Sequence, residues 1–334
     1  MRKPPYPTVQ RPYGRALLQL ARQRDDIVCL SGDLTRQCEV DLFRDELPER
    51  FVHAGMAEAN MIGMAGAMAR EGLNPWVHTF GVFATRRPFD QIVNAVAYPN
   101  LPVRLIGFMP GISSPGGPSH QAIEDVALMR ALPNMTVIDV ADAVEIEQVV
   151  PLIADHPGPV YLRLKRGEIP VVFDDDRALS LREAQVIGEG GEVALYTNGM
   201  MLSASLAAAS VLEDSGVRVS VVNVPVIKPL DTATVLQVAR ESRAMVTAEN
   251  HSIIGGLGSA VAETLAEAGL GRTLRRVGVR DTFAEGALTA PYLFDRYGLS
   301  TQDIVDAAWQ ALGRRDDSPR APVIKADAGE YSPV

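Results

Sequence analysis

The sequence predicts an α/β protein of two doubly wound domains, a parallel-sheet domain followed by a smaller, mostly parallel-sheet domain. Short apolar runs alternate with segments of helical periodicity along the whole chain. The 334 residues are about twice the ~150 that a typical domain contains. A hydrophobic share of 47% is enough for packed cores. This alternation is typical of parallel sheets that are covered by helices on both faces.

The first domain is expected over residues 1–170. Its β-rich runs predict strands at 27–30, 51–54, 75–79, 103–107, 136–140 and 160–164. Helical periodicity between them predicts helices near 12–24, 56–71, 85–97, 121–131 and 142–155. A strand followed by a helix and another strand at this spacing favours right-handed crossovers in one parallel sheet.

The pattern breaks at residues 171–191, which we predict to be a linker. The segment follows Gly167 and Pro170, contains the acidic run 174–176, and ends with three closely spaced glycines. Glycine, proline and clustered charge interrupt regular structure.

The second domain is expected over residues 192–315, with a tail at 316–334. Strands are predicted at 192–197, 217–224, 244–248 and 273–279, and helices near 201–214, 231–241, 256–268 and 300–312. The tail is rich in proline, aspartate and alanine and has no periodicity. We expect it to be loose or to lie as an arm on another subunit.

Charge and composition exclude several classes of function. The 32 basic and 41 acidic residues give a net charge of −9, so nucleic acids and acidic membrane surfaces are poor partners. The longest apolar run, residues 54–69, is too short to span a bilayer, and the first residues lack the apolar segment of a signal peptide. Cys29 and Cys38 form no CxxC pair, and no histidines have metal-ligand spacing. We therefore expect a cytoplasmic protein without a metal site of its own.

Glu58 is the most unusual residue of the chain. It is the single ionisable residue in the apolar run 54–69, where Met61, Ile62, Ala65 and Met68 recur at helical spacing. A carboxyl group in such surroundings is favoured in its protonated form and can donate a proton near neutral pH. A helix-start glutamate that accepts backbone hydrogen bonds is the simpler interpretation.

Two loops could add to a site around Glu58. Residues 79–83 read Thr-Phe-Gly-Val-Phe, which puts Phe80 and Phe83 on one side of a strand-to-helix turn, either as core residues or as a flat surface for a heterocycle. Residues 115–121 read Pro-Gly-Gly-Pro-Ser-His-Gln after a predicted strand. His120 in that loop could bind an anionic group or move a proton, or could simply begin a helix.

Basic residues leave the last predicted strand of the first domain. Arg163 and Arg166 could bind phosphate or carboxylate groups, or could form a solvated basic edge. The glycine-rich run 255–258 lacks both the GxGxxG and the GK[ST] pattern, which favours close helix packing over a phosphate loop.

Four segments together resemble the transketolase family. They are residues 55–58 (Gly-Met-Ala-Glu), 79–83, 116–121 and 133–135 (Pro-Asn-Met). Their order and spacing are similar to those of the family's pyrimidine-binding and C-terminal domains, and the likeness runs from about Tyr13 to about Leu312.

The resemblance implies thiamine diphosphate chemistry and assigns residues to it. It implies that Glu58 hydrogen-bonds the aminopyrimidine and acts as a catalytic acid–base group, while Phe80 and Phe83 stack on the ring. Asp33 is similar to an aspartate that lines the cofactor site, and Arg86, which stands where many members have a tyrosine, is implied to bind the cofactor as well. His120, as a catalytic and substrate-binding residue, and Arg166, as a substrate-binding residue, match positions that hold the substrate's phosphate end.

The chain departs from a whole transketolase in one respect. The family's Gly-Asp-Gly motif, which helps to hold Mg²⁺, is missing, because the one Gly-Asp pair continues into Leu34. The resemblance therefore implies the second half of a split enzyme, with a partner that supplies the diphosphate and Mg²⁺ site in an α2β2 assembly. Gly116 replaces an aspartate of the family, which leaves the sugar open: a pentose phosphate and a modified sugar are equally compatible.

Two other functions remain open from the sequence. The β subunit of a 2-oxo acid dehydrogenase has a similar length, the same two domains and a similar glutamate motif. A non-catalytic scaffold subunit could retain the same fold. Intact Glu58, Phe80, Phe83 and His120 favour an enzyme over a scaffold.

Overall fold

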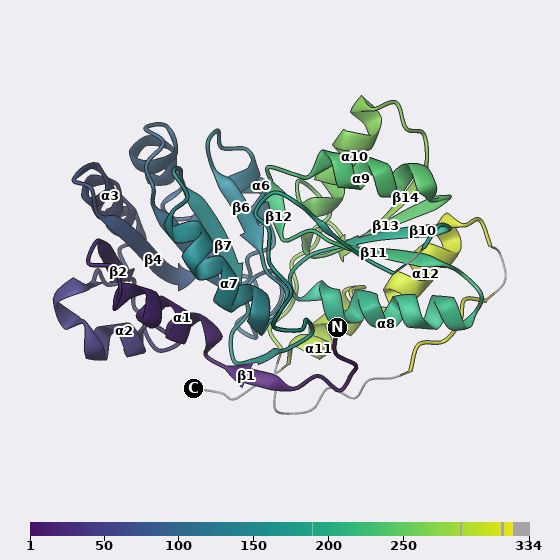
Figure 1. Ribbon diagram of the computed structural model, residues 1–334, viewed down its shortest axis with the longest axis horizontal. Helices are drawn as coiled ribbons and strands as arrows, with labels where there is room; N and C mark the ends of the chain where they lie inside the picture. The colour runs from purple at the N-terminus through teal and green to yellow at the C-terminus, as the bar shows by residue number, and fades with distance from the viewer. Residues whose placement is uncertain (189, 288, 315–316, 323–334) are drawn as a thin grey trace.

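The protein folds into two α/β domains, each built on one sheet (Figure 1). The computed structural model describes residues 1–188, 190–287, 289–314 and 317–322. The first sheet has the strand order β12 (Val226–Lys228), β6 (Thr136–Asp139), β7 (Val160–Leu164), β5 (Arg104–Phe108), β4 (Asn74–Phe80), β2 (Ile27–Ser31) and β3 (Phe51–His53). All neighbours are parallel except β12 and β6. The predicted α/β class with two doubly wound domains is confirmed.

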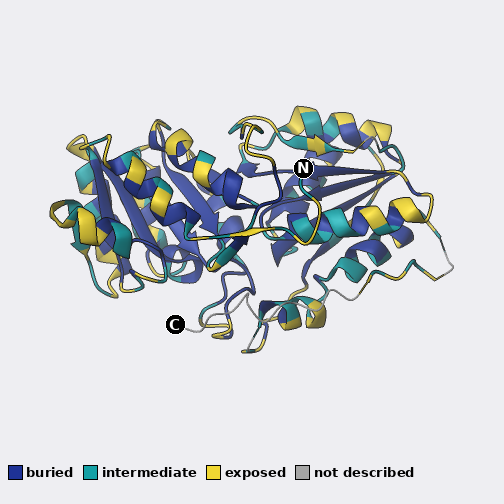
Figure 2. Ribbon diagram, turned by 60° about the horizontal axis from the view of Figure 1, so that its bottom comes forward, coloured by how far each residue is buried: buried dark blue, intermediate teal, exposed yellow. Residues whose placement is uncertain are grey.

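Helices cover both faces of the first sheet because alternate residues of each strand point to opposite sides. In β2, Cys29 packs with Leu17 of α1 in one apolar cluster, whereas Leu30 packs with Met61 of α3 in another. The helices of this domain are α1 (Pro12–Ala21), α2 (Asp41–Glu46), η1 (Pro48–Arg50), α3 (Glu58–Arg70), α4 (Gly81–Thr85), α5 (Phe89–Gln91), the π-helix η2 (Ile92–Ala97), α6 (Asp125–Arg130) and α7 (Ala143–Ala154). Figure 2 shows the strands buried and the outer helix faces exposed.

The second sheet is smaller and mostly parallel. Its strand order is β14 (Thr273–Val279), β13 (Ala244–Ser252), β10 (Val193–Thr197), β11 (Val219–Asn223) and β9 (Gln185–Ile187), with β9 alone antiparallel. Its helices are α8 (Met201–Asp214), α9 (Thr232–Glu241), α10 (Leu257–Glu267), α11 (Ala290–Arg296) and α12 (Thr301–Ala311). Tyr196 packs toward α9 and α10, and Leu195 toward α8 and α12.

Several expected elements differ from those observed. The helix predicted at 85–97 is divided into α4, α5 and η2, because Pro88 has no N–H to continue the helical ladder. The helix predicted at 121–131 shortens to α6, since Arg86 binds the carbonyls of Pro118 and Gln121 and keeps this stretch irregular. The sequence pattern missed β9, β12 and the two-stranded antiparallel sheet of β1 (Thr8–Gln10) and β8 (Glu168–Pro170).

The predicted linker contains ordered structure. Val172 and Phe173 are buried in the core, and their backbone amides donate to Asp142 at 2.9 and 2.8 Å. β9 then adds to the second sheet. The division of the chain at 171–191 stays a prediction. Of the predicted tail, the amide of Ala321 donates to Gln302 of α12 at 2.8 Å, and residues 316 and 323–334 lie outside the described residues.

The first turn of α7 connects the two domains through a buried carboxyl group. Glu145 accepts hydrogen bonds from the amide of Ala141 at 2.8 Å and from the side chain of Asn223, in β11, at 2.7 Å. Burial raises the pKa of Glu145 from 4.5 to about 8. Between these two pKa values the folded chain keeps a proton on Glu145 that the unfolded chain releases. The stabilisation that this proton provides is therefore lost as the pH rises from 4.5 to about 8.

Glu145→Gln is expected to remove this pH dependence. The unfolding free energy of the wild type should fall relative to the variant by up to about 1.4 kcal/mol per pH unit between roughly pH 5.5 and 7.5. Urea denaturation of both proteins across this range measures the difference. Glu147→Gln, at an exposed position of the same helix, is the control. A constant difference between wild type and Glu145→Gln would contradict the assignment.

Candidate active site

The candidate residues gather at the carboxyl edge of the first sheet. Asp33 follows β2, Glu58 follows β3, Phe80 ends β4, His120 lies in the loop after β5, and Arg166 follows β7. Because these strands are parallel, their carboxyl ends lie on one edge, which is where open α/β sheets bind ligands.

Glu58 is the first residue of α3 and is only 4% exposed. Its Oε1 atom accepts a hydrogen bond from Nη1 of Arg87 at 2.8 Å. The sequence predicted that only apolar side chains surround this carboxyl group. That expectation is wrong, because the guanidinium of Arg87 is its partner. The sequence offered no local signal for Arg87, since it lies 29 positions away, beyond β4.

Phe80 and Phe83 form a parallel pair, with ring centroids 6.3 Å apart and planes inclined by 9°. The guanidinium of Arg87 lies over Phe83 at 4.3 Å from the ring centroid. His120 meets the same ring edge-on at 5.2 Å. Phe83 thus contacts both Arg87, which is the partner of Glu58, and His120. Together with Phe80, these side chains form one continuous cluster.

His120 lies in a tightly folded loop. Its Nδ1 atom is 2.9 Å from the hydroxyl of Ser119, and its amide donates to the carbonyl of Gly117 at 2.9 Å. A Cβ atom on Gly116 would lie 2.8 Å from Cβ and Cγ of His120. The imidazole therefore occupies the space that any side chain at position 116 would need.

Arg86 holds this loop in place. It forms an ion pair with Glu124 and donates to the carbonyls of Pro118 at 3.2 Å and Gln121 at 3.0 Å. Four such bonds fix the guanidinium against the loop. The structure thus assigns Arg86 a positioning role, and its predicted contact with a cofactor stays a prediction.

Arg163 requires a correction, because its side chain has no exposed surface. It donates to Asp125 at 2.9 Å, to Asp139 at 2.5 Å and to the carbonyl of Asn250, in the second domain, at 3.0 Å. Burial alone would lower the pKa of Arg163, but the two carboxylates raise it. The guanidinium is fully buried and makes four hydrogen bonds within the protein, which argues against the predicted substrate-binding role.

The network around Arg163 joins the two domains. Tyr161 donates to Asp125 at 2.6 Å, and the side-chain amide of Asn198 donates to Asp139 at 3.1 Å. Burial raises the pKa of Asp139, and Arg163 opposes this effect. A buried charge is tolerated where it is paired and hydrogen-bonded, as it is here.

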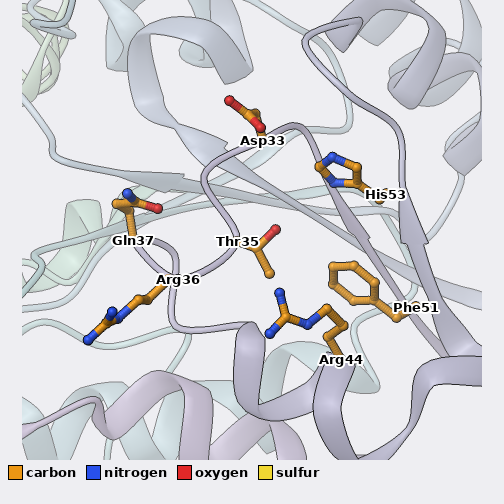
Figure 3. A pocket seen from close by; sticks show the side chains of 7 residues that line it. All are labelled: Asp33, Thr35, Arg36, Gln37, Arg44, Phe51 and His53. Atoms are coloured by element: carbon orange, nitrogen blue, oxygen red, sulfur yellow. The ribbon is translucent and has the colours of Figure 1, made fainter. Parts of the chain in front are cut away.

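Asp33 lines a cavity of about 560 Å³ beside β2 and β3 (Figure 3). Its lining residues are Asp33, Thr35, Arg36, Gln37, Arg44, Phe51 and His53. Glu58, Phe80 and His120 are not among its lining residues. Gly32, next to Asp33, lies between this cavity and the segments that carry Glu58 and Phe80. A Cβ atom there would lie 3.6 Å from the hydroxyl of Thr79 and from the carbonyl of Gly55.

Arg166 lies two residues beyond β7 and is partly buried. Burial raises the pKa of the Cys38 thiol, and the positive charge of Arg166 opposes that rise. Arg166, unlike Arg163, follows the strand instead of lying within it. Its predicted contact with a substrate anion stays a prediction.

Within residues 1–188, 190–287, 289–314 and 317–322, no three His, Cys, Asp or Glu side chains are arranged to hold a metal ion. No helix in these ranges has the length and apolar character needed to cross a bilayer.

Comparisons with known proteins match both halves of the chain. Residues 7–171 match the model of the transketolase pyrimidine-binding domain, and residues 182–304 match that of the transketolase C-terminal domain. An uncharacterized transketolase family protein of Sinorhizobium fredii is 46% identical over 90% of this chain and 87% of its own length. A 6-deoxy-6-sulfo-D-fructose transketolase subunit of Clostridium sp. strain MSTE9 is 41% identical over 91% of this chain and 94% of its own length.

A solved structure extends the likeness to three dimensions. A split-gene transketolase in an inactive β4 tetramer superposes with a TM-score of 0.83 at 40% sequence identity. The match covers 92% of this chain and 99% of that one. The likeness therefore spans nearly the whole of both chains.

Proposed function

This chain belongs to the transketolase family, and we propose that it is one subunit of a split, thiamine-diphosphate-dependent transketolase. The subunit takes part in moving a two-carbon ketol unit from a ketose donor to an aldose acceptor. The observation that carries the proposal is the buried Glu58 beside the parallel Phe80 and Phe83 rings at one sheet edge.

These side chains fit the aminopyrimidine of thiamine diphosphate. The parallel phenyl rings offer a flat apolar surface for a heterocycle. Arg87 donates to Oε1 of Glu58, and we assign Oε2 to the ring nitrogen of the cofactor. When bound, the cofactor supplies a nucleophilic carbon for cleavage and transfer of the ketol unit. Oε2 of Glu58 would exchange a proton with that ring nitrogen, and the burial of the Glu58 side chain limits the access of water to it.

A partner subunit would complete the site with the cofactor's diphosphate and Mg²⁺. The surface beside Glu58 supports this, because Met56 is 77% exposed and the outer face of α3 presents Ala59 and Ala67 to solvent. Exposed apolar surface beside a catalytic group is typical of an interface. A relative in an inactive tetramer of one subunit type is consistent with a need for the other. We propose an α2β2 assembly in the cytoplasm.

The proposed substrates are sugars with an anionic end. His120 and Arg166 are the proposed ligands of that end, and both lie at the carboxyl edge. The similarity to a sulfofructose transketolase subunit favours testing a sulfonate as well as a phosphate. Both groups are tetrahedral oxyanions that a guanidinium can bind through paired hydrogen bonds.

Reconstitution tests the proposal. The chain is purified from its native cells under mild conditions, and a stoichiometric partner with a Gly-Asp-Gly motif is expected by mass spectrometry. The complex, with thiamine diphosphate and Mg²⁺, should transfer ketol units from ketose phosphates or sulfonated ketoses and should not turn over 2-oxo acids. Turnover of 2-oxo acids alone would indicate a dehydrogenase subunit. Neither activity, with no cofactor bound, would indicate a scaffold.

Arg166→Ala is expected to raise KM for anionic substrates by roughly tenfold or more, the effect of losing one charge-assisted hydrogen bond. Because Arg166 only positions the substrate, kcat should change little. Steady-state kinetics of the complex measure both constants. Arg182→Ala removes an exposed arginine outside the site and is the control. An unchanged KM with a lower kcat would contradict the positioning role.

A further inference from the structure

The loop that carries His120, residues 115–121, contacts the second domain. Residues 285–287, which we call the brace, lie against it. The amide of Ala287 donates to the carbonyl of Pro115 at 3.2 Å. In return, the side chain of Gln121 donates to the carbonyl of Glu285 at 3.2 Å. The loop is thus bonded to the brace at both of its ends.

Close packing between glycines adds to these two bonds. A Cβ atom on Gly286 would lie 3.3 Å from the carbonyl oxygen of Pro115 and 3.7 Å from the amide nitrogen of Gly117. Gly117 has a φ of +70° and is buried, although its neighbours in the loop are exposed. The backbone of the brace therefore packs closely on the turn of the loop. A side chain at position 286 would push the two segments apart.

The brace is itself anchored to α11. The amide of Glu285 donates to the hydroxyl of Tyr297 at 2.8 Å, which fixes its backbone. Its carboxylate accepts a hydrogen bond from Tyr292 at 3.0 Å and forms an ion pair with Arg296 at 2.7 Å. The exposed ion pair alone contributes little, but three contacts converge on one residue. The second domain thus presents a fixed surface to the loop.

We infer that the brace positions the His120 loop and thereby sets the affinity of the site for its sugar substrate. This inference rests on the proposed function, because it assumes that His120 binds substrate. The side chain of Gln121 is buried and donates to the carbonyls of Ser114 and Glu285, while its Oε1 atom has no hydrogen-bond partner among the described residues. The hydrogen bonds that Glu285 and Ala287 of the brace make to the first domain run to this loop.

A graded series of substitutions at Gly286 tests the inference. Gly286→Ala and Gly286→Val place one and then three carbons against the loop, and KM for the sugar should rise with size, by about tenfold or more for valine. The value of kcat should change by no more than about twofold, because the substitution acts on the loop and replaces neither Glu58 nor its partner Arg87. Gly271→Val is the matched control, because nothing lies within 4 Å of a Cβ at that glycine of the same domain.

Hydrogen exchange of the chain provides a readout that does not depend on activity. Both Gly286 variants and Gln121→Met should speed exchange at residues 116–121 and leave α3 unchanged. An unchanged KM together with unchanged loop exchange would overturn the inference and leave the proposed function intact. A lower thermal midpoint with an unchanged KM would reduce the brace to a structural contact and also overturn it. A wild-type complex without ketol transfer would count against the proposed function instead.

Discussion

Glu58→Gln is expected to lower the turnover of the assembled enzyme by about a hundredfold or more, the scale of a lost acid–base contact. Glutamine has nearly the same shape and can still accept a hydrogen bond from Arg87 through its amide oxygen. It cannot exchange a proton with the cofactor ring at the position assigned to Oε2. The chain should therefore fold and bind its partner while the proton transfer is lost.

Steady-state turnover of the reconstituted complex, with circular dichroism of each chain, measures this effect. Glu71→Gln is the matched control, because Glu71 is an exposed carboxylate at the other end of the same helix. Turnover within about twofold of the wild type would remove Glu58 from the catalytic machinery. It would also return the scaffold interpretation to consideration.

Arg163→Met is expected to destabilise the folded chain by about 3–5 kcal/mol, because it leaves two buried carboxylates without their shared cation. Asp125 and Asp139 come from different elements of the first domain, and Asn250 from the second. Removal of the guanidinium should loosen all three contacts together. Arg163→Lys keeps the charge but not the forked geometry, so an intermediate loss is expected.

Urea denaturation measures the loss in both variants. Arg275→Met, at an exposed strand position of β14, is the control for replacing a strand arginine. The experiment also distinguishes the two interpretations of Arg163. If the side chain bound substrate, Arg163→Met would raise KM without lowering the denaturation midpoint.

The sequence predicted the main strands and helices where its signals were local. Alternation of strands and helices predicted the order of the main strands, and the carboxyl ends of parallel strands then had to share one edge. That rule sufficed to bring the loops of Asp33, Glu58, Phe80 and His120 to the same edge. Phe80 lies at a strand end and Asp33 just after one, whereas Glu58 begins the helix that follows β3 and His120 lies farther along the loop after β5.

The failures have a common physical cause, which is contact between segments distant in the chain. Arg163 lies within a strand between Leu162 and Leu164, so its side chain points to one face of the sheet. Only the folded structure shows that two carboxylates lie within hydrogen-bond distance on that face. Arg87 meets Glu58 across a strand and a turn. The short strand β12 has no periodicity of its own and forms only because β6 offers it an edge.

The strand β12 crosses the boundary between the two domains. It comes from beyond the predicted linker, yet it pairs antiparallel with β6 and completes the sheet of the first domain. During synthesis, the first sheet stays unfinished until residue 228 has left the ribosome. A fragment that ended at residue 191 would expose the backbone groups of β6, which form a ready template for strands of other molecules. The second half of the chain therefore protects the first half from aggregation.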